Sequence, residues 1–133
     1  FELNYPRGKE FVEAFSNRYE MRPSTAAASA YSIIYQYKDA VERAGTTNTA
    51  SLIRALEGHR YTFLKDEQYW REFDHQNVQT VYVVKVKPRN TIIADEYSSD
   101  YFSIIDSMPG DQAAQTREEW EERRREAGKP LRL

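Results

Sequence analysis

The chain has 133 residues, of which 40% are hydrophobic and 30% are charged. This composition suits one domain with a packed core and argues against disorder of the whole chain. The formal net charge of −2 argues against a broad nucleic-acid surface, and the absence of cysteine excludes disulfides, a thiol nucleophile and Cys-based metal sites. No run approaches the roughly 20 apolar residues that a membrane-spanning helix needs.

The first half of the chain predicts helices. After a break at Pro6, apolar residues recur at three and four over residues 9–19, which indicates an amphipathic helix. A second helix begins at a cap, Ser24 or Thr25, and is closed by Gly45, where a left-handed residue belongs. Its predicted buried stripe follows steps of three and four: Ala27, Ala30, Ile34, Tyr37, Val41 and Ala44.

A short third helix is predicted after the turn at residues 46–48. Asn48 or Thr49 caps it, and it runs through Leu56. Leu52, Ile53 and Leu56 form its predicted buried face.

The stretch over residues 61–88 is the predicted packing centre. A short strand at 61–64 precedes a run rich in β-branched and aromatic residues at 78–86. Four consecutive apolar positions in this run predict that both faces of the strand are covered and that the helices pack there. Beyond it, residues 91–94 are predicted as a short strand, whereas 101–105 fit either a strand or a helix.

The C-terminal region is predicted to be polar, with a helix over residues 116–127. Thr116 and Glu119 have the spacing of a capping box. Arg123, Arg124 and Arg125 alternate with nearby glutamates that cancel their field, which favours a solvated helix face over a phosphate contact.

Strands are too few for a complete open sheet, because three helices precede the first convincing one. The edges of the 78–86 strand then need partners from outside this sequence. This deficit also predicts self-association, or strand exchange between copies of the chain.

Catalytic candidates are sparse. His75, in Asp74-His75-Gln76, is either a general base oriented by the carboxylate or part of a turn at a strand start, and the turn is favoured. His59 follows Gly58 at a helix end, where the dipole favours a cation. Two isolated histidines make a poor metal site, so we predict a protein that is not an enzyme and uses no cofactor or metal.

The start of the second helix is the candidate ligand site. Pro23, Ser24, Thr25, Ala26 and Ala27 surround a helix N-terminus, whose unpaired N–H groups suit a carboxylate or a polar ligand head. Their small side chains let a ligand approach the backbone closely.

Three elements carry a resemblance to a known family. They are Asp-Ala-Val-Glu-Arg-Ala-Gly-Thr-Thr at 39–47, Leu-Ile-Arg-Ala-Leu-Glu-Gly at 52–58, and Asp-His-Gln at 74–76 before the strand at 81–86. In this order and spacing they resemble the C-terminal part of substrate-binding proteins of branched-chain amino-acid-type ABC transporters. That group includes leucine/isoleucine/valine-binding and urea/amide-binding proteins. The similarity runs from about residue 9 to about residue 110.

The resemblance implies an α/β fold that is an incomplete portion of a type I periplasmic-binding-protein (Rossmann-like, two-lobe) fold. Three helices would pack on a few strands, and a further helix would lie near the C-terminus. Residues 1–110 would form the C-terminal section of a substrate-binding protein, mostly one lobe, and residues 111–133 a polar tail. The rest of the two-lobe protein would lie outside this chain.

The function implied by the resemblance is solute binding. An amino acid, an amide or a small organic acid would be captured and passed to ABC permease subunits, in the periplasm or another extracytoplasmic space of a bacterium. Residues 24–27 look like the family's ligand-facing position in this section, and alanines stand where members that bind large apolar side chains tend to have a bulky residue. The same fold also serves as the ligand-sensing domain of regulators or receptors, and this alternative stays open.

Overall fold

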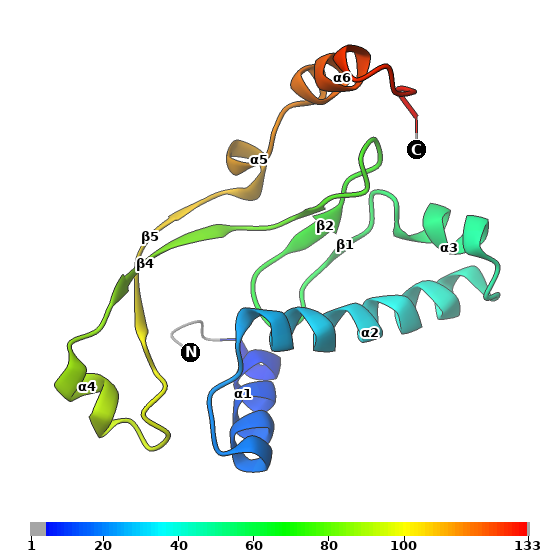
Figure 1. Cartoon of the computed structure of the whole chain (residues 1–133). Coiled ribbons are helices and arrows are strands. Elements are labelled where there is room, and N and C mark those ends of the chain that lie inside the picture. The colour runs from blue at the N-terminus through cyan, green and yellow to red at the C-terminus, as the bar shows by residue number, and fades with distance from the viewer. Residues whose placement is uncertain (1–4, 133) are drawn as a thin grey trace.

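Three helices form the first half of the chain (Figure 1). The computed structural model describes residues 5–132 and places α1 at Pro6–Tyr19, α2 at Thr25–Ala44 and α3 at Thr49–Leu56. The predicted caps are confirmed, because the side chains of Ser24 and Asn48 accept hydrogen bonds from backbone amides of α2 and α3. Gly45 closes α2 with a left-handed φ of 64°.

Helix α1 begins at Pro6 rather than at Lys9, so the predicted break at Pro6 is wrong. Proline is favoured at the first helical position because the N–H that it lacks would have no intrahelical acceptor there. Gly8 lies within the helix and against another segment, since a Cβ at this position would be 2.2 Å from the carbonyl oxygen of Leu64. Residues 1–4 of the predicted N-terminal section lie outside the described residues.

The buried side of α2 differs from the predicted stripe. Gln36 and Ala40 are its buried residues, whereas Ile34 and Tyr37 are 65% and 53% exposed. In α3, Leu52 is buried as predicted but Ile53 is exposed. The predicted stripe, with Tyr37 as a core residue, is therefore wrong within residues 5–132, where much of it is open to solvent.

The strands form two separate antiparallel sheets. One has the order β1-β2-β3, made of Arg60–Tyr61, Gln68–Trp70 and Asn77–Val78. The other is a two-stranded ribbon of β4 (Val81–Val86) and β5 (Phe102–Met108), which extends away from α2 (Figure 1).

The predicted continuous strand over residues 78–86 is split between these sheets. Val78 is buried in β3, the chain then leaves that sheet, and β4 begins at Val81. Val83 and Val86 are 49% and 63% exposed. The prediction of a strand covered on both faces at the packing centre is therefore wrong.

The ribbon contains one irregularity. Val83 lies opposite Asp106, whereas the next residue, Val84, lies opposite Ile104. Ile105 is thus an extra residue on β5, as in a β-bulge.

Residues between the ribbon strands form a helix. α4 spans Arg89–Ala94, so the strand predicted at 91–94 is wrong. Pro88 precedes the first residue of α4, and its carbonyl oxygen accepts from the amides of Thr91 and Ile92. The ambiguous segment at 101–105 is part of strand β5.

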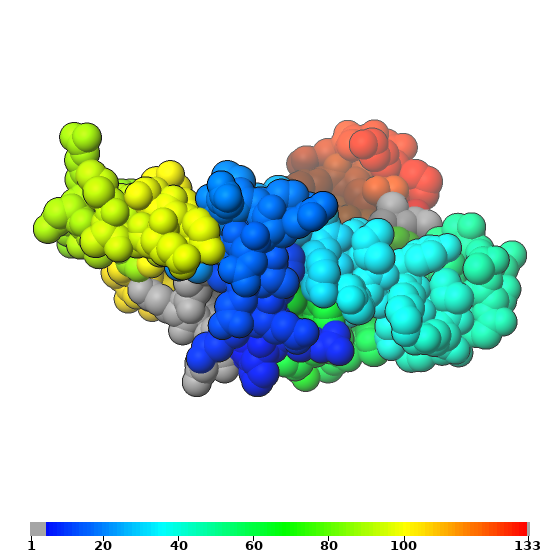
Figure 2. Space-filling model, turned by 90° about the horizontal axis from the view of Figure 1, so that it is seen from below, coloured from blue at the N-terminus to red at the C-terminus, as the bar shows by residue number. Residues whose placement is uncertain are grey.

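Arg22 joins the α1–α2 connection to the segment between α4 and β5, two regions that lie side by side in Figure 2. Its Nη2 lies 2.8 Å from Asp95 Oδ1, and its backbone amide donates to Ser99 Oγ at 3.0 Å. Its guanidinium group also lies 5.0 Å from the centre of the Tyr97 ring. We call this contact the Arg22–Asp95 latch, and it holds the α4 end of the ribbon against the helices.

We expect acid to weaken this latch. Hydrogen bonds from Arg22, and then from the amides of Ser99 and Tyr97, outweigh burial and hold the pKa of Asp95 below its ordinary value. A carboxyl group of this kind stabilises the fold above its unfolded-state pKa, and the stabilisation is lost as the pH falls through the folded-state pKa. The free energy of unfolding, measured in urea from about pH 7 to about pH 3, should therefore fall more for the native chain than for Asp95→Asn. Equal losses in the two proteins would contradict the expectation.

The C-terminal part carries α5 (Gly110–Ala113) and α6 (Arg117–Glu126). The capping box of Thr116 and Glu119 is present at the start of α6. Trp120 is buried and meets the Phe73 ring edge-on, with 5.3 Å between ring centres. The polar helix is thus anchored through its one large apolar residue.

None of the helices in residues 5–132 combines the length and the apolarity that crossing a bilayer requires.

Candidate ligand-binding site

The five predicted site residues lie together at the first turn of α2. Ser24 Oγ accepts a hydrogen bond from the Ala27 amide at 3.1 Å. Helix geometry leaves the amides of Thr25 and Ala26 without intrahelical acceptors. Ser24, Thr25 and Ala26 are exposed, whereas Pro23 and Ala27 are half-buried. The turn therefore offers backbone donors to a polar group, with small side chains around them.

An aromatic groove lies between α1 and α2, and Ala27 is part of its lining. Its volume is about 550 Å³. Phe11 and Tyr31 face each other with 4.7 Å between ring centres, and Tyr31 continues to Tyr35 at 4.9 Å. Arg7, Glu10 and Arg18 also line the groove, so it combines flat apolar surface with charged groups of both signs.

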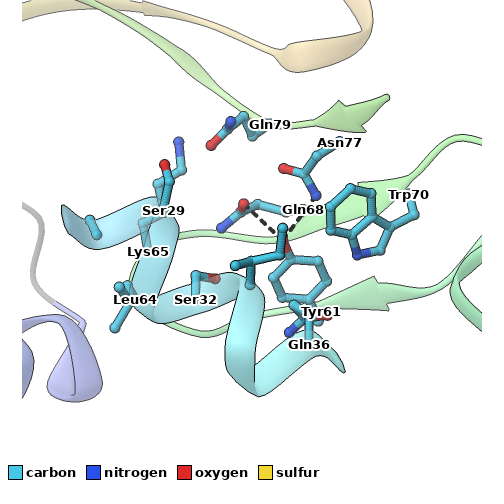
Figure 3. A pocket seen from close by; sticks show the side chains of 12 residues that line it. Ser29, Ser32, Gln36, Tyr61, Leu64, Lys65, Gln68, Trp70, Asn77 and Gln79 are labelled. Carbon is cyan, nitrogen blue, oxygen red and sulfur yellow. Dashed lines mark hydrogen bonds between the residues drawn. The ribbon is translucent and has the colours of Figure 1, made fainter. Parts of the chain in front are cut away.

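A polar cavity of about 190 Å³ lies between α2 and the three-stranded sheet. Five residues of α2 line it, and the sheet and its connecting segments contribute the rest (Figure 3). Those of α2 are Ala28, Ser29, Ser32, Ile33 and Gln36. Tyr61, Lys65, Gln68, Trp70 and Asn77 are among the lining residues on that side.

Hydrogen bonds fix part of the sheet side of this cavity. Asn77 Nδ2 donates to the Tyr61 hydroxyl oxygen at 2.9 Å, and the Tyr61 hydroxyl donates to Gln68 Oε1 at 3.2 Å (Figure 3). Burial raises the pKa of Tyr61, so this hydroxyl keeps its proton at neutral pH. This part of the cavity wall is therefore a preformed set of neutral polar groups.

None of the residues that line the polar cavity was predicted as a site residue. A signal existed on the helix side, because Ser29, Ser32 and Gln36 are spaced by three and four and so share one face of α2. On the sheet side no such signal exists, since Tyr61, Gln68 and Asn77 meet only through strand pairing.

The two histidines take structural positions. The carboxylate of Asp74 accepts from Arg71, whereas His75 Nε2 lies 3.0 Å from Glu57 Oε1. Asp74 therefore does not orient the imidazole of His75, as the general-base hypothesis required. His75 has a φ of 56°, as in a tight turn, which supports the favoured reading of this residue. Nε2 of the other histidine, His59, lies 3.2 Å from Asp39 Oδ2.

A metal site does not emerge either. Within residues 5–132, no group of three or more histidine, aspartate or glutamate side chains is placed to hold a metal ion.

Comparison with known proteins identifies the family. The sequence profile described as "Periplasmic binding protein" matches residues 1–91. No curated protein matches the chain. Solved structures do share its fold.

A periplasmic binding protein from Burkholderia mallei is 22% identical, with a TM-score of 0.76 over 87% of this chain and 30% of that one. A branched-chain amino acid ABC transporter periplasmic ligand-binding protein from Burkholderia xenovorans LB400 is 21% identical, with a TM-score of 0.76 over 90% of this chain and 31% of that one. An ABC transporter solute-binding protein from Rhodopseudomonas palustris BisB5, solved with 3,4-dihydroxybenzoic acid, is 22% identical, with a TM-score of 0.68 over 80% of this chain and 28% of that one.

This chain therefore spans about 30% of the length of the solved structures that it matches. Their fold confirms the predicted α/β class, as an incomplete portion of the type I periplasmic-binding-protein fold. The family binds ligands and is not enzymatic, which confirms the prediction that the protein is not an enzyme. The match over residues 1–91 also confirms the resemblance seen in the sequence: the chain belongs to the periplasmic binding protein family.

Proposed function

We propose that this chain is part of the solute-binding component of an ABC importer. It would bind an amino acid, an amide or a small organic acid in the periplasm and present the solute to membrane permease subunits. The observation that carries this proposal is the family match over residues 1–91. Two structures that share the fold support it, since one is described as an amino acid ABC transporter substrate-binding protein and another holds 3,4-dihydroxybenzoic acid.

The proposed solute contact is the first turn of α2, residues Pro23, Ser24, Thr25, Ala26 and Ala27. The backbone amides at this turn suit an anionic or polar head group, because a helix N-terminus carries partial positive charge. The neighbouring aromatic groove, which Ala27 also lines, would receive the flat or apolar part of the solute. Residues 1–110 would carry this binding section, and 111–133 would be a polar tail.

Capture would follow from lobe closure. A solute that contacts both lobes binds the closed form better and shifts the population towards it. In this proposal the remaining part of the two-lobe protein supplies most of the cleft. The 133-residue chain alone should then bind its solute weakly.

Calorimetric titration with amino acids, amides and aromatic acids tests this proposal. We expect one solute class to bind the chain with a dissociation constant well above about 1 μM. Ala27→Trp should abolish that binding, because the indole would fill the space beside the first turn of α2. The matched variant Ala50→Trp, at an exposed position of α3, should bind like the native chain.

Two results would contradict the proposal. Binding tighter than about 1 μM would mean that the chain holds a complete cleft by itself. Binding that survives Ala27→Trp would remove the first turn of α2 as the contact.

A further inference from the structure

The β4–β5 ribbon carries both of its charged side chains on one face. Its strands contain one charged residue each, Lys85 on β4 and Asp106 on β5. Residues two positions apart on a strand point to the same face, and residues paired across two strands share a face. Asp106 is paired with Val83, so it lies on the same face as Lys85. We call this side the charged face of the ribbon, and its members are Val81, Val83, Lys85, Ser103, Asp106 and Met108.

The two charges are free to meet a partner. Lys85 and Asp106 are both exposed, and neither of them forms an ion pair within residues 5–132. Asp106 accepts a hydrogen bond from the neighbouring amide of Ser107, which leaves its charge uncompensated. The next charged residue along the chain differs, because Nζ of Lys87 lies 2.6 Å from Oδ2 of Asp100.

Apolar surface lies beside these charges. On the charged face, Val83 is 49% exposed and Met108 is 47% exposed. Burial of such surface against a partner is favourable, and charges around it fix the orientation of the partner. In a two-fold contact between identical chains, each residue meets the same counterpart on the other copy and the reverse contact also forms. A face with one charge of each sign is therefore complementary to itself.

We propose that the charged face is a docking surface for a second copy of this chain. Two ribbons would stack face to face and antiparallel, with Lys85 of each copy beside Asp106 of the other. A two-fold axis that passes between the Val83–Asp106 pair and the Lys85–Ser103 pair produces this arrangement, because it brings one pair over the other. The small number of strands predicts self-association through strand edges, whereas these charges indicate a face of the ribbon. The inference does not depend on the proposed role in transport.

The dimer should be weak and sensitive to salt. Six side chains from each copy make a small contact, so we expect a dissociation constant on the order of 100 μM in low salt. Sedimentation equilibrium from about 10 μM to about 1 mM protein covers this range. Added sodium chloride should weaken the association, because it screens exposed charges.

Charge reversal at either position tests the contact. Lys85→Glu and Asp106→Lys each place like charges together twice in the dimer, so each variant alone should associate at least about tenfold more weakly than the native chain. An equal mixture of the two variants should associate like the native chain, because the glutamate placed at position 85 then meets the lysine placed at position 106. This recovery would also show that both variants are folded. Lys129→Glu changes the net charge by the same amount as Lys85→Glu at another exposed position, and it should associate like the native chain.

Three results would overturn the proposal. One is a native chain that stays monomeric up to about 1 mM in low salt. Another is association of the separate reversal variants as tight as that of the native chain, which would place the contact on the strand edges or on the opposite face. The third is a mixture that associates no better than its components, which would exclude the reciprocal pairing of Lys85 with Asp106.

Discussion

Replacing Asp74 by asparagine should lower the free energy of unfolding by about 2–3 kcal/mol. Asp74 and Arg71 form a two-pronged ion pair, with Nε to Oδ1 at 2.9 Å and Nη2 to Oδ2 at 2.5 Å, and their side chains are only 6% and 12% exposed. Asparagine removes the charge and one acceptor, which leaves the guanidinium group partly buried without its counter-charge. Arg71 also donates to the carbonyl oxygen of Gln115, so we expect the C-terminal helix to loosen with it.

Urea denaturation at neutral pH measures this loss. Burial pushes the pKa of Asp74 upward, but hydrogen bonds from Arg71 and the Gln76 amide outweigh it and leave the pKa below its ordinary value, so the group is ionised under these conditions. Glu42→Gln is the matched control, because its pair with Lys38 is exposed on both sides and should contribute at most about 0.5 kcal/mol. Equal effects of the two substitutions would show that the Arg71–Asp74 pair adds nothing beyond a surface contact.

Replacing Gly8 by alanine should destabilise the chain, although helix propensity alone predicts the opposite. Alanine in a helix is normally favoured over glycine by roughly 1 kcal/mol. Here the added Cβ would lie 2.2 Å from the carbonyl oxygen of Leu64 and 3.3 Å from its carbonyl carbon, both backbone atoms that cannot rotate away. We expect a net loss of about 2 kcal/mol, or displacement of α1 from the 62–65 segment.

Gly45→Ala provides the comparison for this experiment. A Cβ at Gly45 would meet nothing within 4 Å, so only its left-handed φ of 64° opposes alanine, at a cost of about 1 kcal/mol. If thermal unfolding shows that Gly8→Ala is as stable as the native chain, α1 does not pack against the Leu64 carbonyl as described.

Helix ends could be predicted from the sequence, whereas the partners of the strands could not. Ser24, Asn48 and Thr116 cap their helices through bonds to residues three positions on, so all the information is local. The pairing and burial of residues 78–86 depend on β5, which is distant in the sequence, and on the faces of the strand that other segments cover. An apolar run shows that a strand is suited to burial, but it does not show which other segment of the protein packs on the strand.

The candidate binding regions differ in the same way in how far the sequence predicts them. Residues 23–27 could be selected because they form one helix start, and their role in binding stays a prediction. The polar cavity unites α2 with three strands and could not be found before the fold was known. Gln36 is the instructive case, since it lies next to the apolar stripe in the sequence pattern and yet is among the most buried residues of its helix.

The bulge at Ile105 changes which side of the ribbon is apolar. Successive side chains of a strand point to opposite faces, and residues paired across two strands share a face. Because Ile105 is an extra residue, Met108 and Asp106 lie on one face of the ribbon, whereas Ile104 and Phe102 lie on the other. One face carries Val81, Val83 and Met108, and the opposite face carries Val84, Val86, Ile104 and Phe102. No single flat layer can shield both patches. Shielding both patches from water would therefore take contacts on both faces of the ribbon.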